Sequence, residues 1–171
     1  MKIIGGCIAI SLVLLAAGAS AREQIWASVP NAAAPKIIRL AKRGDIKAEA
    51  QLGWMYSKGR GVPQNYFAAA YWYYLAAQRG HGGAQFELGL MYNKGEGVPR
   101  DFVLAYFWLN LSASQAVGDD RDFKAGIRDA VASKMTAEQV ALAQDMSLGW
   151  FGSRESESSG AQIWHPRRPA L

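Results

Sequence analysis

The sequence predicts an all-α fold, a short α-solenoid of stacked antiparallel helix pairs. A block of thirty-six residues, 41–76, is followed directly by a second copy, 77–112. Within each copy, apolar residues recur at helical spacing. Tandem similarity with a period of 20–50 residues is typical of stacked repeats, in which each unit buries its apolar face against its neighbours.

The two copies agree at sixteen of thirty-six positions, and the agreement is densest between LGWMYSKGRGVP (52–63) and LGLMYNKGEGVP (88–99). Each residue that follows has an identical twin thirty-six positions later: Ala41, Arg43, Gly44, Ala48, Leu52, Gly53, Met55, Tyr56, Lys58, Gly59, Gly61, Val62, Pro63, Ala69, Trp72 and Leu75.

The first twenty-one residues have the pattern of a signal peptide. Lys2 precedes an uncharged, mostly apolar run, and Ala19 and Ala21 form an A-x-A cleavage site before Arg22. The alternative is an uncleaved anchor, because residues 3–21 carry no charge. Both versions place the repeats outside the cytoplasm, in the periplasm or secreted. The single cysteine, Cys7, lies in this segment, so cleavage leaves a chain without disulfide or thiolate chemistry.

Residues 22–34 read as a linker, and residues 35–152 as one repeat domain. The domain opens with a cap helix over 35–43, which has a proline near its first turn. In the first repeat, Ala48, Leu52, Met55 and Tyr56 form a helical stripe within 47–57.

Glycine and asparagine mark the boundaries inside each repeat. Gly59 is suited to a left-handed helix cap, and Asn65, matched by Asp101, to the N-cap of the second helix. The second helices are predicted over 66–78 and 102–115. Gly53 and Gly89 fall in mid-helix, where glycine costs about 1 kcal/mol against alanine. We therefore expect the paired helices to approach closely at these two residues.

A C-terminal helical hairpin, 119–152, is expected to close the array. Its first helix carries Phe123, Ile127 and Val131 on one face, and Thr136 with Gln139 forms a capping box for the second. The apolar face of that second helix holds Val140, Ala143 and either Met146 or Leu148. The hairpin lacks G-x-G-V-P, so it is not a third true repeat. Residues 153–171 read as a disordered tail, in which Trp164-His-Pro-Arg-Arg-Pro is either a docking motif or unselected sequence.

The repeat resembles the Sel1-like repeat, a relative of the tetratricopeptide repeat. The resemblance depends on A-x-x-x-L-G-x-M-Y-x-K-G-x-G-V-P, followed by Asn or Asp, an aromatic residue and a tryptophan-containing helix, over 48–72 and 84–108. It implies an α-solenoid that acts mainly as an interaction scaffold, and an exported bacterial member. The family has no shared catalytic residues, so the resemblance implies none here.

Site chemistry is sparse in this sequence, and we expect no catalytic residue, metal site or cofactor. The only histidines are His81 and His165, and no motif for a nucleotide, a phosphate or a catalytic serine is present. Acidic residues at 119 and 120 suit the start of a helix better than a cation site. The formal net charge of +5 is scattered, so nucleic acid is not an expected partner.

One face of the first helices is our candidate partner-binding surface, because its residues differ between the copies while the core stripe does not. Trp54 is the expected anchor, since tryptophan is enriched where binding energy concentrates. The alternative is that Trp54 packs on the N-terminal cap helix. The resemblance implies that first helices line the concave side of the solenoid. The candidate residues are Lys47, Gln51, Trp54 and Lys58 in the first copy and Glu87, Leu90 and Lys94 in the second.

These observations favour a non-enzymatic scaffold or adaptor that binds a protein or peptide in the bacterial cell envelope. Two alternatives stay open. One is a cell-wall or β-lactam-type hydrolase, suggested by activities linked to some exported Sel1-like proteins, although those relatives are rich in cysteine. The other is a peptidoglycan- or glycan-binding protein that uses aromatic side chains and associates with the cell wall.

Overall fold

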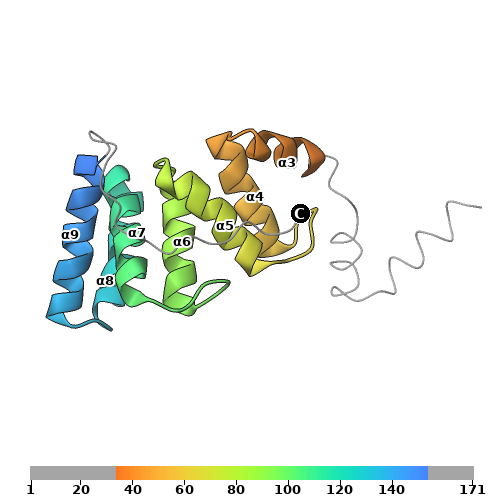
Figure 1. The fold of residues 1–171 in the computed structure, drawn as a ribbon. Helices are drawn as coiled ribbons and strands as arrows, with labels where there is room; N and C mark the ends of the chain where they lie inside the picture. Colours follow the sequence, from red (N-terminus) through yellow and green to blue (C-terminus); the bar gives the residue numbers. More distant parts are fainter. Residues whose placement is uncertain (1–33, 154–171) are drawn as a thin grey trace, which may run out of the picture.

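A computed structural model describes residues 34–153 of the chain (Figure 1). The signal segment, nearly all of the linker and the tail from 154 onward lie outside the described residues, as does the Trp164 motif. The described helices are α3 (Ala34–Lys42), α4 (Ile46–Lys58), α5 (Tyr66–Gln78), α6 (Gly82–Lys94), α7 (Phe102–Gln115), α8 (Gly118–Ala132) and α9 (Ala137–Ser153).

The helices stack in chain order, which confirms the predicted solenoid. α4 packs against α5 and α6 against α7, and the contact between α5 and α6 joins these two pairs. α3 covers α4, so that α3 stands at one end of the array and α9 at the other (Figure 1). Between residues 34 and 153, no helix is both long enough and apolar enough to cross a bilayer.

The predicted caps are present at the expected residues. Asn65 and Asp101 each accept a hydrogen bond from the backbone N–H three residues later, at 3.0 Å in both repeats. Gly59 and Gly95 end α4 and α6 with φ values of 66° and 77°, the left-handed conformation that glycine adopts without steric cost. His81 has a role that the sequence did not indicate, because its Nδ1 caps α6.

Gly53 and Gly89 lie where the paired helices come closest, as predicted. A Cβ atom at Gly53 would lie 2.7 Å from the ring of Tyr73 on α5. At Gly89 it would lie 2.7 Å from the Cγ of Leu109 and 3.1 Å from the carbonyl oxygen of Ala105, both on α7. The absence of a side chain therefore sets the distance between the helices of each pair.

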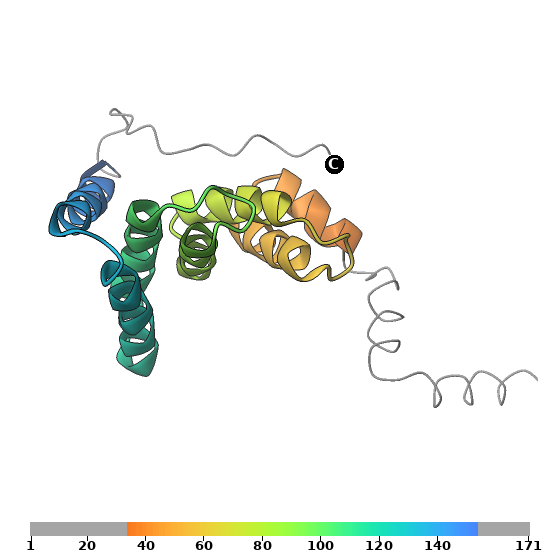
Figure 2. The ribbon, with the colours of Figure 1, turned by 90° about the horizontal axis from the view of Figure 1, so that it is seen from below.

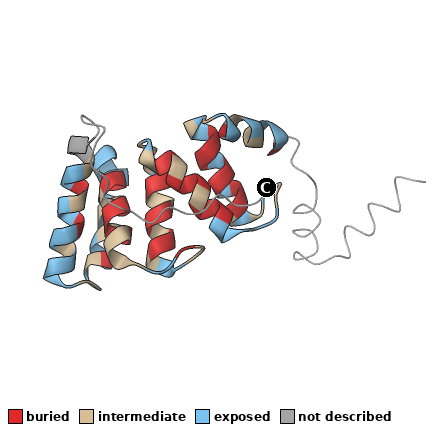
Figure 3. Cartoon of the chain, in the orientation of Figure 1, coloured by how far each residue is buried: buried red, intermediate tan, exposed pale blue. Residues whose placement is uncertain are grey.

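Aromatic side chains form the centre of the core, where the buried residues of α4 to α7 gather (Figure 3). Trp72 and Trp108, at equivalent positions in the two repeats, are 1% and 0% exposed, which confirms that they are structural. The ring of Trp108 lies edge-on to Tyr74 of α5 at 6.2 Å and to Trp150 of α9 at 5.4 Å. One tryptophan thus connects α5, α7 and α9, three helices that are not consecutive in the chain.

A polar pair with one buried member links α4 to Arg79, directly after α5, and its counterpart links α6 to the end of α7; the chemistry of the pair differs between the copies. In the first repeat, Glu49 of α4 forms an ion pair with Arg79, which also donates to the carbonyl of Gly44 at 2.7 Å. In the second repeat the equivalent residues are Gln85 and Gln115, whose amides are joined by a 2.8 Å hydrogen bond. Both members of the pair change together from one copy to the other.

The C-terminal helices differ from the predicted hairpin in one respect. The capping box is present, because Thr136 and Gln139 exchange hydrogen bonds of 3.0 and 3.3 Å. However, α8 and α9 each pack on α7 and scarcely touch each other. The two helices therefore diverge from each other (Figure 2). A helix pair like α4 and α5 is therefore not repeated here, in line with the missing G-x-G-V-P loop.

Two apolar residues of this region lie further out than their spacing suggested. Phe123 is 59% exposed, and one side of its ring contacts Phe86 of α6. Leu148 is 71% exposed, whereas Met146 is the residue of α9 that packs on the core beside Ala143. Periodicity alone left Met146 and Leu148 undecided, and the structure places Met146 on the buried side of α9 and Leu148 on the exposed side.

The close approach at Gly89 predicts that Gly89→Ala destabilises the protein. We expect a loss of about 1–3 kcal/mol in the free energy of unfolding, because the new methyl group overlaps Leu109 and α7 must move away. Urea denaturation of the purified variant measures this change.

The matched control is Gly126→Ala in α8, where a Cβ atom would meet nothing within 4 Å. This variant should gain up to about 1 kcal/mol from the helix propensity of alanine. If the two variants change stability in the same direction, the close approach is not what selects glycine at position 89.

The paired replacement at positions 49 and 79 predicts a rescue. Arg79→Gln should cost about 2–3 kcal/mol, because it leaves the Glu49 carboxylate, whose side chain is 4% exposed, without its cation. The double variant Glu49→Gln, Arg79→Gln reproduces the amide pair of the second repeat and should recover most of that loss. Thermal unfolding of the three proteins provides the comparison.

The Arg79→Gln variant should also become more stable as the pH falls. Burial raises the pKa of Glu49 above its usual 4.5, and Arg79 opposes this shift in the wild type. A carboxyl group whose pKa is raised by folding stabilises the protein below its unfolded pKa and loses this effect as the pH rises through the folded pKa. Equal pH profiles for the single and the double variant would contradict this account.

Candidate functional site

The predicted surface consists of Lys47, Gln51, Trp54 and Lys58 on α4 and Glu87, Leu90 and Lys94 on α6, and we call it the first-helix face. All four α4 residues are exposed. On α6, Lys94 is exposed, while Glu87 and Leu90 are partly buried. The two copies therefore offer different surfaces at equivalent positions.

Trp54 is the largest apolar side chain of this face, and it is 44% exposed. The cap helix α3 packs on α4 but does not bury the indole, so the alternative placement of Trp54 is not observed. Its twin Leu90 packs against the core cluster instead. The exchange of leucine for tryptophan thus leaves an aromatic ring in solvent only in the first repeat.

The α4 and α6 parts of the face are neighbours. α4 contacts α6 directly, and the buried Tyr73 of α5 packs beside Gly53 of α4. Burial, with a smaller contribution from the negative charge of Glu87, raises the pKa of Tyr73, while Ser57 acts in the opposite direction. The hydroxyl group of Tyr73 is therefore neutral.

Two further aromatic residues are exposed near the end of α4, and the sequence did not single them out. Tyr66 and Phe67, at the start of α5, are 40% and 38% exposed. Gln64 donates hydrogen bonds to the carbonyl of Ser57 at 2.9 Å and to the hydroxyl of Tyr66 at 3.2 Å. These bonds hold the Tyr66 ring beside the helical turn that follows Trp54.

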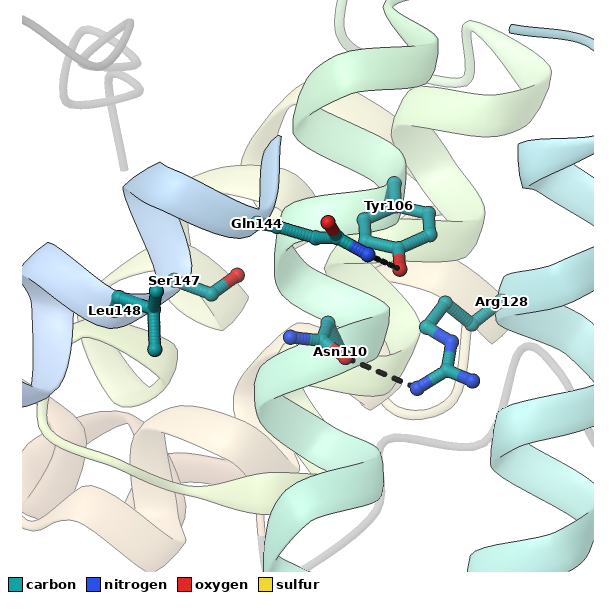
Figure 4. Close-up of a pocket in the computed structure, with 6 residues that line it drawn as sticks. All are labelled: Tyr106, Asn110, Arg128, Gln144, Ser147 and Leu148. Carbon is teal, nitrogen blue, oxygen red and sulfur yellow. Dashed lines mark hydrogen bonds between the residues drawn. The ribbon is translucent and has the colours of Figure 1, made fainter. Parts of the chain in front are cut away.

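A groove is open where α8 and α9 diverge over α7 (Figure 4). It has a volume of about 380 Å³. Across it, the amide of Gln144 donates to the hydroxyl of Tyr106 at 3.3 Å, and the guanidinium of Arg128 donates to the amide oxygen of Asn110 at 3.0 Å. The residues that line the groove are Tyr106, Asn110, Arg128, Gln144, Ser147 and Leu148.

A second hollow of about 310 Å³ lies on the other side of the Arg128–Asn110 bond and shares both residues. Arg128 is also bonded to its neighbour Asp129 and lies over the Tyr106 ring, 5.8 Å from its centroid. The amide and hydroxyl groups of the groove, with the paired Arg128, can donate and accept hydrogen bonds.

The sequence contains a signal for this groove, but it lies on the second helices of the repeats and not on the first helices. The twins of Tyr106 and Asn110 in the first repeat are Ala70 and Tyr74. These positions also differ between the copies, but on the second helix. The divergence of α8 from α9, which opens the groove, has no such signal because it depends on tertiary packing.

Metal-binding groups do not converge in the part of the chain that the structure describes, where no cluster of three or more His, Cys, Asp or Glu side chains occurs. Acidic residues 119 and 120 lie in the first turn of α8, as their interpretation through the helix dipole predicts.

Comparison with known proteins identifies two repeats in this domain. The model of the Sel1 repeat matches residues 46–81 and 83–117. The chain is similar to a protective antigen of uropathogenic Escherichia coli that displays an SLR fold, with 28% identity and a TM-score of 0.60 over 75% of this chain and 29% of that one. No curated protein matches the chain.

The chain is also similar to a Sel1 repeat protein from Oxalobacter formigenes, with 38% identity and a TM-score of 0.46. That match covers 47% of this chain and 61% of the other. The present chain thus spans less than two thirds of the length of either solved relative. Sel1 repeats generally mediate protein–protein interactions. Residues 46–81 and 83–117 of this chain are thus two Sel1 repeats in tandem, which form a solenoid of stacked helix pairs.

Proposed function

We propose that this protein is a non-enzymatic scaffold of the bacterial cell envelope that binds a protein or peptide partner through the first-helix face. The observation that carries the proposal is the exposure of Trp54, 44%, at a position where the second repeat packs a leucine against its core. An indole left in solvent forgoes the free energy that burial provides, and a partner that covers it restores that gain.

The surroundings of Trp54 have the composition of a binding surface. Its helical neighbours on the same face, Lys47, Gln51 and Lys58, are exposed and polar. Interfaces commonly place an aromatic anchor at the centre and polar side chains at the rim, where water keeps access. The partly buried Glu87 and the exposed Lys94 extend this surface onto α6.

Binding to peptidoglycan or another glycan is the second candidate, and a specific observation favours it. Trp54, Tyr66 and Phe67 are all between 38% and 44% exposed and belong to the same repeat. Exposed aromatic rings combine an apolar face with a polar edge in Trp and Tyr, which suits the mixed surface of a sugar ring. Side chains described here do not favour the hydrolase alternative.

Photo-crosslinking in intact cells tests the proposal. A photoreactive amino acid at position 51 should give a discrete protein adduct, because Gln51 is exposed one turn from Trp54. Adding Trp54→Ala to the same protein should reduce the adduct about tenfold or more, as expected for loss of an aromatic hot spot of at least 1.4 kcal/mol. Mass spectrometry of the adduct identifies the partner.

The matched control places the crosslinker at Ser133, an exposed residue after α8 that is not part of the first-helix face. The proposal is wrong if positions 51 and 133 give the same adducts. If Trp54→Ala instead abolishes binding of the purified protein to protein-free sacculi, with no protein adduct in cells, the glycan function replaces it.

Export is part of the proposal and has its own test. Cell fractionation should place the protein in the envelope fraction with Arg22 as its first residue, since Ala19 and Ala21 precede that bond. Replacing Ala21 with a bulky residue should block processing. An envelope protein that retains Met1 would show the uncleaved anchor instead, and a protein confined to the cytoplasm would contradict export.

A further inference from the structure

The two outermost described helices carry opposite charge. α3 has Lys36, Arg39 and Lys42, all exposed, and no acidic residue; Arg43 follows directly and is exposed as well. Because these residues are three to four positions apart, they lie along one side of the helix. α3 therefore presents a purely basic face to solvent.

α9 presents the complementary pattern. Its charged residues are Glu138 and Asp145, both exposed, and it has no basic residue. Leu142 and Leu148, 53% and 71% exposed, complete a stripe with the spacing of i, i+4, i+7 and i+10. The outward side of α9 thus combines carboxylates with exposed leucines.

These charges are not used within the described chain. None of the charged residues of the two stripes forms an ion pair with another residue of 34–153. Helix dipoles account for Lys42 at the end of α3 and for Glu138 at the start of α9. They do not account for Lys36, a cation in the first turn of its helix, or for Asp145 in mid-helix.

The charge asymmetry extends beyond the two helices. Residues 34–100 contain ten Lys and Arg against four Asp and Glu, whereas residues 101–153 contain four against seven. The basic and acidic helices stand at opposite ends of the array (Figure 1). α3 packs on α4 and α9 on α7, so each keeps a side on which a solenoid would stack its next unit.

We propose that copies of this protein associate head to tail, with the basic face of α3 in one copy on the outward face of α9 in the next. Lys36, Arg39 and Lys42 pair with Glu138 and Asp145, and the aliphatic stems of the basic side chains cover Leu142 and Leu148. Such a contact joins two different surfaces, so it generates open chains or rings rather than closed dimers. It leaves the first-helix face of every copy accessible, which would present several copies of that face to one partner.

Sedimentation velocity with reversed charges tests this interface. Two double variants are needed, Lys36→Glu with Arg39→Glu and Glu138→Lys with Asp145→Lys. The wild type should sediment faster with rising concentration, and its association constant should fall about tenfold from low to high salt. Each double variant alone should remain monomeric, because the two reversed side chains of one end helix then face side chains of like charge on the other. An equimolar mixture of the two variants should associate again, since each then finds an oppositely charged end.

The control is Arg60→Glu with Arg100→Glu, which changes the net charge equally at two exposed loop residues and should associate like the wild type. Circular dichroism verifies that all variants are folded. Failure of the mixture to associate, or association of the wild type that ignores salt, overturns the proposal. It is also overturned if the wild type stays monomeric while Lys36→Glu with Arg39→Glu abolishes binding to phosphatidylglycerol vesicles, because the basic face then serves a lipid surface.

Discussion

Close approaches at Gly53, Gly89 and Gly97, where no side chain fits, determine the spacing of this solenoid. Gly53 and Gly89 let α4 and α6 lie directly on the side chains of α5 and α7. Gly97, with a φ of 69°, brings the loop of the second repeat onto the backbone at the start of α5, where a Cβ atom would lie 2.2 Å from the carbonyl oxygen of Tyr66. Its twin Gly61 has the same left-handed conformation. The spacing within a helix pair and the spacing between repeats therefore both depend on the absence of a side chain, and the large aromatic residues fill only the room that remains.

Within that frame the two repeats have kept their geometry while their chemistry has changed. The polar pair that links the two helices of a unit is ionic in the first copy, Glu49 with Arg79, and neutral in the second, Gln85 with Gln115. Each version satisfies its own buried polar atoms, whereas a mixture would leave a carboxylate or a guanidinium without its partner. Surface positions are under no such constraint. Trp54 is exposed where its twin Leu90 packs on the core, so the two copies differ at this position in exposure as well as in residue type.

The parts of the fold that could be predicted are those with a local cause. Helix bounds at 66–78 and 102–115, the caps at Asn65 and Asp101 and the close approach at Gly53 follow from spacing, capping chemistry and the cost of a mid-helix glycine. The divergence of α8 and α9 could not be predicted, since it depends on how Trp150 and Ala143 pack on α7. The groove lined by Tyr106 and Asn110 follows from that divergence and was missed with it. The first-helix face was found by comparing copies, and its role in binding is a prediction that exposure supports.

The position of α9 has a consequence for the order in which the molecule opens. In a linear array each unit is stabilised by its neighbours, and α9 has one, α7. Its buried anchor is small, since Ala143 and Ser147 are the fully enclosed residues and Trp150 is only partly covered. Local opening of α9 should therefore require a free energy well below that of the central pairs. The release of α9 would expose Phe107 and Trp108, because both rings contact Trp150 of that helix. The stability of α9 therefore controls the access of water to this part of the aromatic core.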